Sequence, residues 1–133
     1  MRIFQRYQVP FPANISAIHF GRFTGPNYLT SERIFPKSVD APIGEQTLRF
    51  NLYIPTGIAP EGGWPVMLYG HGYRSHRMNA ASHASALAAK GVATLAINAV
   101  GHGGGPDGSI LADLTTIPDG GRAVDMNGDG QYL

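Results

Sequence analysis

Two short clusters of glycine and histidine, Gly70-His71-Gly72 and Gly101-His102-Gly103, carry the residue types best suited to chemistry. Glycine adopts backbone angles that residues with a Cβ avoid, so it can direct a backbone N–H toward a ligand. An amide held in this way stabilises the negative charge that develops on a carbonyl oxygen during acyl transfer. A general-base role for His71 or His102 requires a serine or carboxylate neighbour, so we interpret both histidines as shaping their turns by hydrogen bonds.

A second candidate site is the loop DMNGDGQY, which matches the start of the calcium-loop pattern D-x-[DN]-x-[DN]-G. Asp125, Asn127 and Asp129 occupy its first, third and fifth places, and Gln131 offers its backbone carbonyl at the seventh. Such oxygen ligands suit Ca²⁺. The bidentate glutamate of an EF-hand would lie beyond the sequence and no helix pattern precedes the loop, so this is not an EF-hand. Two interpretations stay open: a structural calcium loop, and an Asp/Asn/Gly turn without metal.

The remaining histidines invite a zinc interpretation, which we do not favour. His76 and His83 are seven residues apart and are the only pair that would share a helical face. The sequence contains no H-E-x-x-H motif, and it contains no cysteine to complete a thiolate site.

The glycine clusters must be positioned by the elements around them. Val66 to Tyr69 is an apolar run with no polar gap, which predicts a strand covered on both faces of a parallel sheet. A helix is expected roughly from Met78 or Asn79 to Lys90, with Gly91 as its C′ residue, and a second buried strand from Val92 to Asn98. This is a β-α-β unit with parallel strands, so both glycine clusters should lie at the carboxyl edge of the sheet, where ligands bind.

The region before this unit has a different pattern. Ile15 to Phe23 alternates as a strand does, and with the short apolar run Arg33 to Phe35 it predicts a small antiparallel element. Gln46 to Ile54 alternates polar with apolar residues and is the clearest strand by pattern. His19 and Arg22 are interpreted as polar residues on the solvated face of the first element. We therefore divide the chain into an extended, hairpin-like region, 1–44, and a second region, 45–133.

Composition excludes several classes of function. The 133 residues carry a net charge of +1 with no long run of either sign, which argues against a nucleic-acid partner. The absence of cysteine excludes disulfides and a cysteine nucleophile. No apolar run approaches the ~18 residues that a membrane span needs, and the N-terminus lacks the apolar core of a signal peptide.

From residue 45 to about 105 the sequence resembles the first half of an α/β-hydrolase domain. The resemblance lies in the alternating strand QTLRFNLYI, the strand that ends in GHGY, the helix that ends in LAAKG and the strand that ends in NAVGHG. It implies an α/β fold class: antiparallel N-terminal strands that lead into a parallel β-α-β unit, incomplete alone. It is closest to carboxylesterases and cutinase-like polyester hydrolases. By position, the backbone N–H of Tyr73, after His71-Gly72, would then belong to the oxyanion hole, and the Tyr73 ring would line the acyl pocket.

Two departures from the family pattern bear on function. Asn98 stands where many members have an aspartate, at a structural position. No G-x-S-x-G nucleophile elbow occurs, and none of Ser75, Ser82, Ser85 and Ser109 opens a helix after a strand. We therefore expect the N-terminal portion of a serine ester hydrolase, whose partner is a complementary segment or chain that carries the elbow. The alternative is a non-catalytic calcium-binding or interaction module. A calcium loop would also favour an extracytoplasmic setting.

Overall fold

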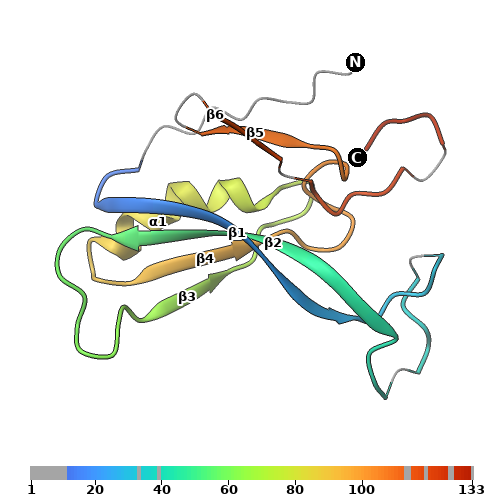
Figure 1. Cartoon of the computed structure of the whole chain (residues 1–133), viewed down its shortest axis with the longest axis horizontal. Coiled ribbons are helices and arrows are strands. Elements are labelled where there is room, and N and C mark those ends of the chain that lie inside the picture. The colour runs from blue at the N-terminus through green and yellow to red at the C-terminus, as the bar shows by residue number, and fades with distance from the viewer. Residues whose placement is uncertain are drawn as a thin grey trace.

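A computed structural model describes residues 12–32, 34–38, 40–112, 115–118, 120–125 and 128–132 of the chain. Within residues 110–112 and 115–118 only the backbone is described. The described chain forms one four-stranded sheet, a separate two-stranded ribbon and one helical segment (Figure 1). The fold is therefore a mixed α/β fold, as the sequence predicts at this level.

The four-stranded sheet has the order β1-β2-β4-β3. Its strands are β1 (Ile15–Asn27), β2 (Gly44–Pro55), β3 (Val66–Tyr69) and β4 (Ala93–Ile97). β1 pairs antiparallel with β2 and β2 pairs antiparallel with β4, whereas β3 and β4 are parallel. Most of the pairing in this sheet is thus antiparallel. The predicted β-α-β unit is confirmed, because the parallel strands β3 and β4 are joined by a helical segment.

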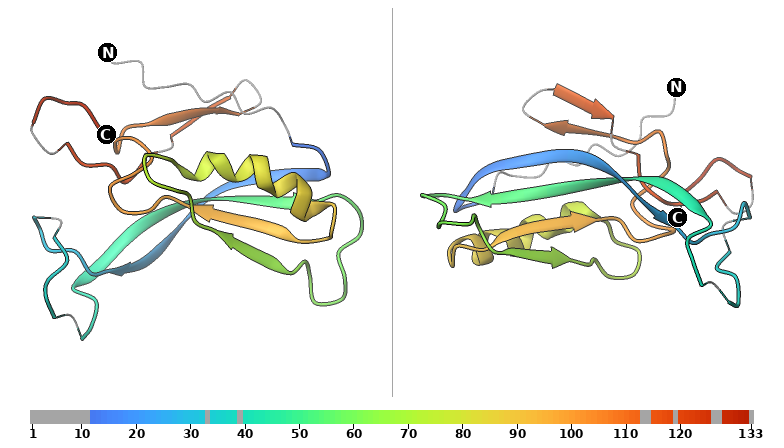
Figure 2. Two further views of the ribbon diagram at one scale, coloured as in Figure 1. Left: turned by 180° about the vertical axis from the view of Figure 1, so that it is seen from behind. Right: turned by 60° about the horizontal axis from the view of Figure 1, so that its bottom comes forward.

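The helical segment between β3 and β4 begins one residue earlier than expected and ends sooner. It consists of the 3₁₀ turn η1 (Arg77–Ala80) and α1 (Ala81–Ala88). Gly91 has a φ of 71°, a left-handed conformation that suits glycine after a helix. The segment covers one face of the sheet (Figure 2). The buried residues of α1 are all alanines, which lets this helix approach the strands closely: Ala81, Ala84 and Ala88.

The hydrophobic core lies between α1 and the sheet face that carries Tyr53 and Ala96. On β2, alternation places Asn51 and Tyr53 on this face, and both are fully buried. Phe50, Leu52 and Ile54 point to the opposite face and are only half-buried. The helix therefore covers the more polar side of the most regularly alternating strand.

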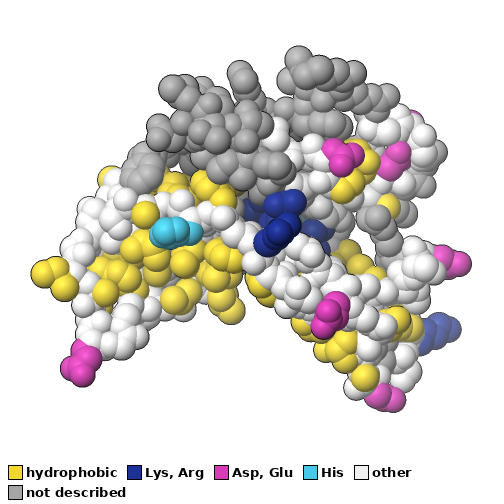
Figure 3. All heavy atoms as spheres, in the orientation of Figure 1, with side chains coloured by type: hydrophobic (Ala, Val, Ile, Leu, Met, Phe, Trp, Pro, Cys, Tyr) yellow, Lys and Arg dark blue, Asp and Glu magenta, His cyan; other side chains and the backbone are white. Residues whose placement is uncertain are grey.

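The prediction that Val66 to Tyr69 is covered on both faces is wrong for the described chain. Val66 is 53% exposed and Leu68 is 75% exposed. The reason is geometric. β3 is an outer strand of the four-stranded sheet, and Tyr69 packs against the core below α1, so alternation along β3 places Val66 and Leu68 on the other face. Hydrophobic side chains gather at this end of the sheet, on the face that the helix leaves open (Figure 3).

Two other pairings differ from the sequence-based expectation. β1 is longer than predicted and pairs along its length with β2, while Ile34 and Phe35 lie outside any strand. The ribbon of β5 (Ser109–Ala112) and β6 (Thr115–Pro118) was not predicted, because only a short apolar patch marks it in the sequence. No helix of the described chain is long and apolar enough to cross a membrane.

Candidate active site at the carboxyl edge of the parallel strands

The two glycine-histidine clusters meet at one edge of the sheet, as predicted. β3 and β4 are paired in parallel from Val66 opposite Ala93 to Tyr69 opposite Ala96, so their carboxyl ends coincide. The first cluster follows β3 directly, and the second lies in the turn after β4. Parallel pairing therefore brings together residues that are about thirty positions apart in the sequence.

His71 joins the two turns through both of its ring nitrogens. The backbone N–H of Ala99 donates to Nε2 of His71 at 2.9 Å, so this nitrogen carries a lone pair. The other nitrogen, Nδ1, lies 2.9 Å from the carbonyl oxygen of Gly72 and must carry the proton to donate to it. We assign the neutral Nδ1–H tautomer from these partners. With its lone pair engaged, His71 positions the turn and is not arranged as a general base.

His102 completes the contact between the turns. Its Nδ1 lies 2.9 Å from the carbonyl oxygen of Val100 within its own turn. The ring centroids of His71 and His102 are 5.1 Å apart, and the Tyr73 ring meets His102 edge-on at 6.1 Å. The interpretation of both histidines as shaping their turns by hydrogen bonds is confirmed. Tyr73 itself is 88% exposed.

Asn98 fastens the start of the helical segment to the end of β4. It is buried, and its side-chain oxygen accepts a hydrogen bond from the backbone N–H of Arg77 at 2.8 Å. Gly103, with a φ of 82°, packs so closely on the Asn98 amide that a Cβ there would collide with it. An aspartate at this place could accept the same hydrogen bond, and the asparagine makes it without burying a charge.

Arg77 is a residue of this region that the sequence did not single out. It is 2% exposed, and its Nε donates to the side-chain oxygen of Asn51 at 3.0 Å. Burial lowers the pKa of Arg77 to about 10, and the neighbouring charge of Arg49 acts in the same direction. Asn51 in turn donates from Nδ2 to the sulfur of Met78 at 2.8 Å. No motif marks these residues, because their partners lie far away in the sequence.

Ser75 and Ser82 form hydrogen bonds with Asn79 near the start of the helical segment. Nδ2 of Asn79 donates to the Ser75 hydroxyl at 2.7 Å, and the Ser82 hydroxyl donates to the carbonyl oxygen of Asn79 at 2.8 Å. The His83 ring packs on the Tyr69 ring, and their centroids are 5.4 Å apart. Within the described ranges, no group of three His, Asp or Glu side chains lies close enough together to hold a metal ion.

The loop after Asp125 folds around that carboxylate. The backbone N–H groups of Gly128 and Gly130 donate to the two carboxylate oxygens of Asp125 at 2.7 and 2.6 Å. The N–H of Gln131 donates to the Asp129 carboxylate at 2.7 Å. Asn127 lies outside the described residues, so the full set of expected calcium ligands is not described. The calcium site remains a prediction.

His76 precedes η1, and we expect it to make the fold less stable at acidic pH. Burial lowers the pKa of His76, and the electrostatic influence of His71 and Arg77 acts in the same direction. The unfolded chain then takes up this proton more readily than the folded chain. The stabilising contribution is therefore present above the ordinary histidine pKa of about 6.5 and is lost as the pH falls through the lower folded value.

Urea unfolding of the wild type and of His76→Gln across this pH range tests the expectation. The wild type should lose stability on acidification more steeply than the variant. His19→Gln, at an exposed position on β1, should follow the wild-type slope. Equal slopes for the wild type and His76→Gln would show that His76 does not contribute.

Comparison of the chain with protein-family models, with curated proteins and with solved structures found no match.

Proposed function

We propose that this chain is the N-terminal portion of a serine carboxylic-ester hydrolase of carboxylesterase or polyester-hydrolase type. It contributes the oxyanion hole and part of the acyl pocket, while the Ser-His-acid triad lies in a downstream segment or a separate chain. The observation that carries the proposal is the hydrogen bond from Ala99 N–H to His71, which locks two glycine-rich turns together at the carboxyl edge of parallel strands.

In this proposal the residues of this chain stabilise the negative charge of the reaction and hold the donor of that stabilisation in position. The serine of the complementary segment attacks the ester carbonyl, its histidine takes the serine proton, and negative charge moves to the carbonyl oxygen. The backbone N–H of Tyr73 donates to that oxyanion, and His71, whose Nδ1 donates to the carbonyl oxygen of Gly72, holds the turn. The exposed Tyr73 ring forms part of the acyl pocket.

The open end of the sheet supports a complementary segment as the partner. β3 is an outer strand of the described sheet, so its free backbone edge is able to pair with a further strand. The exposed side chains of Val66 and Leu68 would be covered by an element of the complementary segment that packs on the open face of the sheet. A parallel strand at this edge would place its own carboxyl end, and a serine elbow after it, beside Tyr73.

An esterase assay with p-nitrophenyl butyrate tests the proposal. The 133-residue chain alone should show no hydrolysis above background, and a polypeptide that continues through the complementary segment should be active and should react with a fluorophosphonate serine probe. Ester hydrolysis by the chain alone, as a monomer, would contradict the proposal, as would a complementary segment without a reactive serine.

A second candidate function is a calcium-binding or interaction module. It is favoured by the Asp125 carboxylate, which two backbone N–H groups hold in place at the first ligand position. Calorimetric titration with CaCl₂ should then show binding that Asp125→Asn weakens by tenfold or more, because the charge of a ligating carboxylate sets much of the affinity. Asp107→Asn, in an exposed turn, is the matched control. Absence of binding by the wild type would exclude this function.

A further inference from the structure

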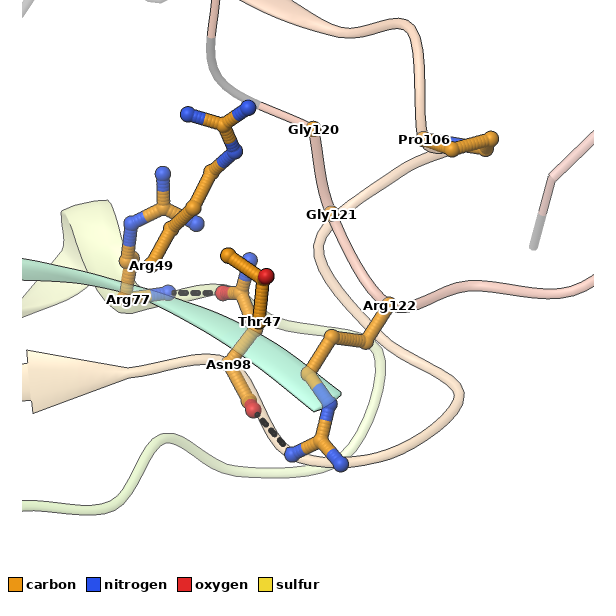
Figure 4. Close-up of a pocket in the computed structure, with 8 residues that line it drawn as sticks. All are labelled: Thr47, Arg49, Arg77, Asn98, Pro106, Gly120, Gly121 and Arg122. Atoms are coloured by element: carbon orange, nitrogen blue, oxygen red, sulfur yellow. Dashed lines mark hydrogen bonds between the residues drawn. The ribbon is translucent and has the colours of Figure 1, made fainter. Parts of the chain in front are cut away.

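A pocket rich in arginine lies beside the candidate active site and takes no part in the proposed chemistry. It has a volume of about 220 Å³ and opens among β2, the start of η1, the end of β4 and the segment 120–122 (Figure 4). Three arginines, Arg49, Arg77 and Arg122, are among the residues that line it, and the guanidinium group of Arg122 points away from those of Arg49 and Arg77 (Figure 4). None of the described residues that line the pocket is acidic.

Hydrogen bonds fix the directions of two of these arginines. Nε of Arg77 is held by the side-chain oxygen of Asn51 at 3.0 Å. Arg122 donates from Nη1 to the carbonyl oxygen of Asn98 at 2.9 Å and from Nη2 to the side-chain oxygen of Gln46 at 3.0 Å. A guanidinium group that is already oriented loses less entropy when it binds an oxyanion.

The segment 120–122, which carries Arg122 and forms one wall of the pocket, packs closely against the turn after β4. The backbone N–H of Gly121 donates to the carbonyl oxygen of Gly105, and that of Arg122 donates to the carbonyl oxygen of His102, both at 2.8 Å. A Cβ on Gly121 would collide with the carbonyl oxygen of Gly103. The glycine is therefore needed to bring Arg122 against the turn after β4, and the pocket is shaped by backbone contacts.

The positive charges of neighbouring arginines around this pocket repel one another. The charge of Arg49 lowers the pKa of Arg77, in addition to the larger effect of burial, and burial also lowers the pKa of Arg122. Arg49 also stands directly opposite Arg22 in the pairing of β1 with β2, an arrangement of like charges that destabilises a sheet. An anion bound beside Arg49 and Arg77 would lower the repulsion between these two residues.

We propose that the pocket lined by Arg49, Arg77 and Arg122 binds a small oxyanion, the carboxylate or phosphate group of a ligand. Such groups match the planar fork of arginine and form charge-assisted hydrogen bonds with it. The volume admits a group of a few heavy atoms and excludes a large apolar ligand. The Thr47 and Asn98 side chains, which also line the pocket, offer further polar contacts. This inference is independent of the hydrolase proposal.

Titration of the chain with inorganic phosphate and, separately, with succinate tests the inference, with amide and arginine Nε–H chemical shifts as the readout. The wild type should bind at least one of the two saturably, with shifts confined to the lining residues. Arg49→Gln should weaken binding by about tenfold or more, the cost of losing one charged hydrogen-bond donor. Preference for phosphate or for succinate then identifies which group the pocket takes.

Lys90→Gln is the matched control, since it removes one positive charge from an exposed position just after α1. It should change the affinity by less than twofold. Arg122→Gln is a second pocket variant and decides the matter where Arg49→Gln does not fold. Absence of saturable binding by the wild type would overturn the inference, and so would equal weakening by the pocket and control variants.

Discussion

Replacing Tyr73 with proline is expected to lower kcat for ester hydrolysis by about 10²–10³-fold in the proposed complete hydrolase, the usual effect of removing one oxyanion-hole donor. Proline has no backbone N–H, so this substitution removes the proposed donor and leaves the two glycine-histidine turns otherwise in place. The hydrogen bond between Ala99 and His71, which holds the turns together, does not involve Tyr73. Because the donor acts on charge that develops in the transition state, kcat should fall far more than KM rises.

Tyr73→Ala separates the amide from the ring. It keeps the backbone N–H and removes the exposed side chain, so kcat should stay within a few-fold of the wild type while KM for long acyl chains rises. Circular dichroism and thermal unfolding of both variants establish that the fold is retained. Similar kcat values for Tyr73→Pro and Tyr73→Ala, in folded proteins, would remove Tyr73 from the oxyanion hole.

Tyr53→Ala is expected to have the largest effect on stability, a loss of about 3–5 kcal/mol, as is usual when a large aromatic side chain is deleted from a core. Tyr53 is fully buried and packs with the alanines of the helical segment and with Ala96. Burial also raises the pKa of its phenol. The neighbours that would have to fill the space are small and lie on rigid elements, so the cavity should persist.

Urea unfolding curves measure this loss as a shift in midpoint at an unchanged slope. Ile58→Ala is the control, because Ile58 is 95% exposed in the loop after β2 and its truncation should cost less than about 0.5 kcal/mol. A Tyr53→Ala variant as stable as Ile58→Ala would mean that the face of β2 carrying Asn51 and Tyr53 is not the core face.

Local features of the sequence were sufficient to predict the β-α-β unit. Continuous apolar runs marked β3 and β4, and the alanine-rich segment between them ended at Gly91, whose left-handed conformation was expected. Parallel pairing of β3 and β4 follows from this order of elements. Because the strands are parallel, the Gly70–Gly72 and Gly101–Gly103 turns meet at one edge of the sheet. These features depend on neighbours in the sequence and on general rules of chain connection.

Only the tertiary structure decided which surfaces are buried. Alternation along β2 separates Leu48, Phe50, Leu52 and Ile54 from Asn51 and Tyr53, but it does not say which face the helix covers. The helix covers the face with Asn51, because Arg77 and Met78 supply partners for that amide. The sequence pattern marks hydrophobicity alone, and it cannot show that a polar side chain will find its hydrogen-bond partners.

The arginine pocket shows the same limit most clearly. Arg49, Arg77 and Arg122 belong to separate elements and form no motif, and in a chain with a net charge of +1 they do not stand out. The hydrogen bonds that orient Arg77 and Arg122 span 24 to 76 residues. The sequence by itself determined the elements of the β-α-β unit and the edge at which chemistry is expected, since these follow from local patterns. Which residues surround the pocket was decided by long-range packing, because closing a long loop has an entropic cost that local sequence patterns do not show.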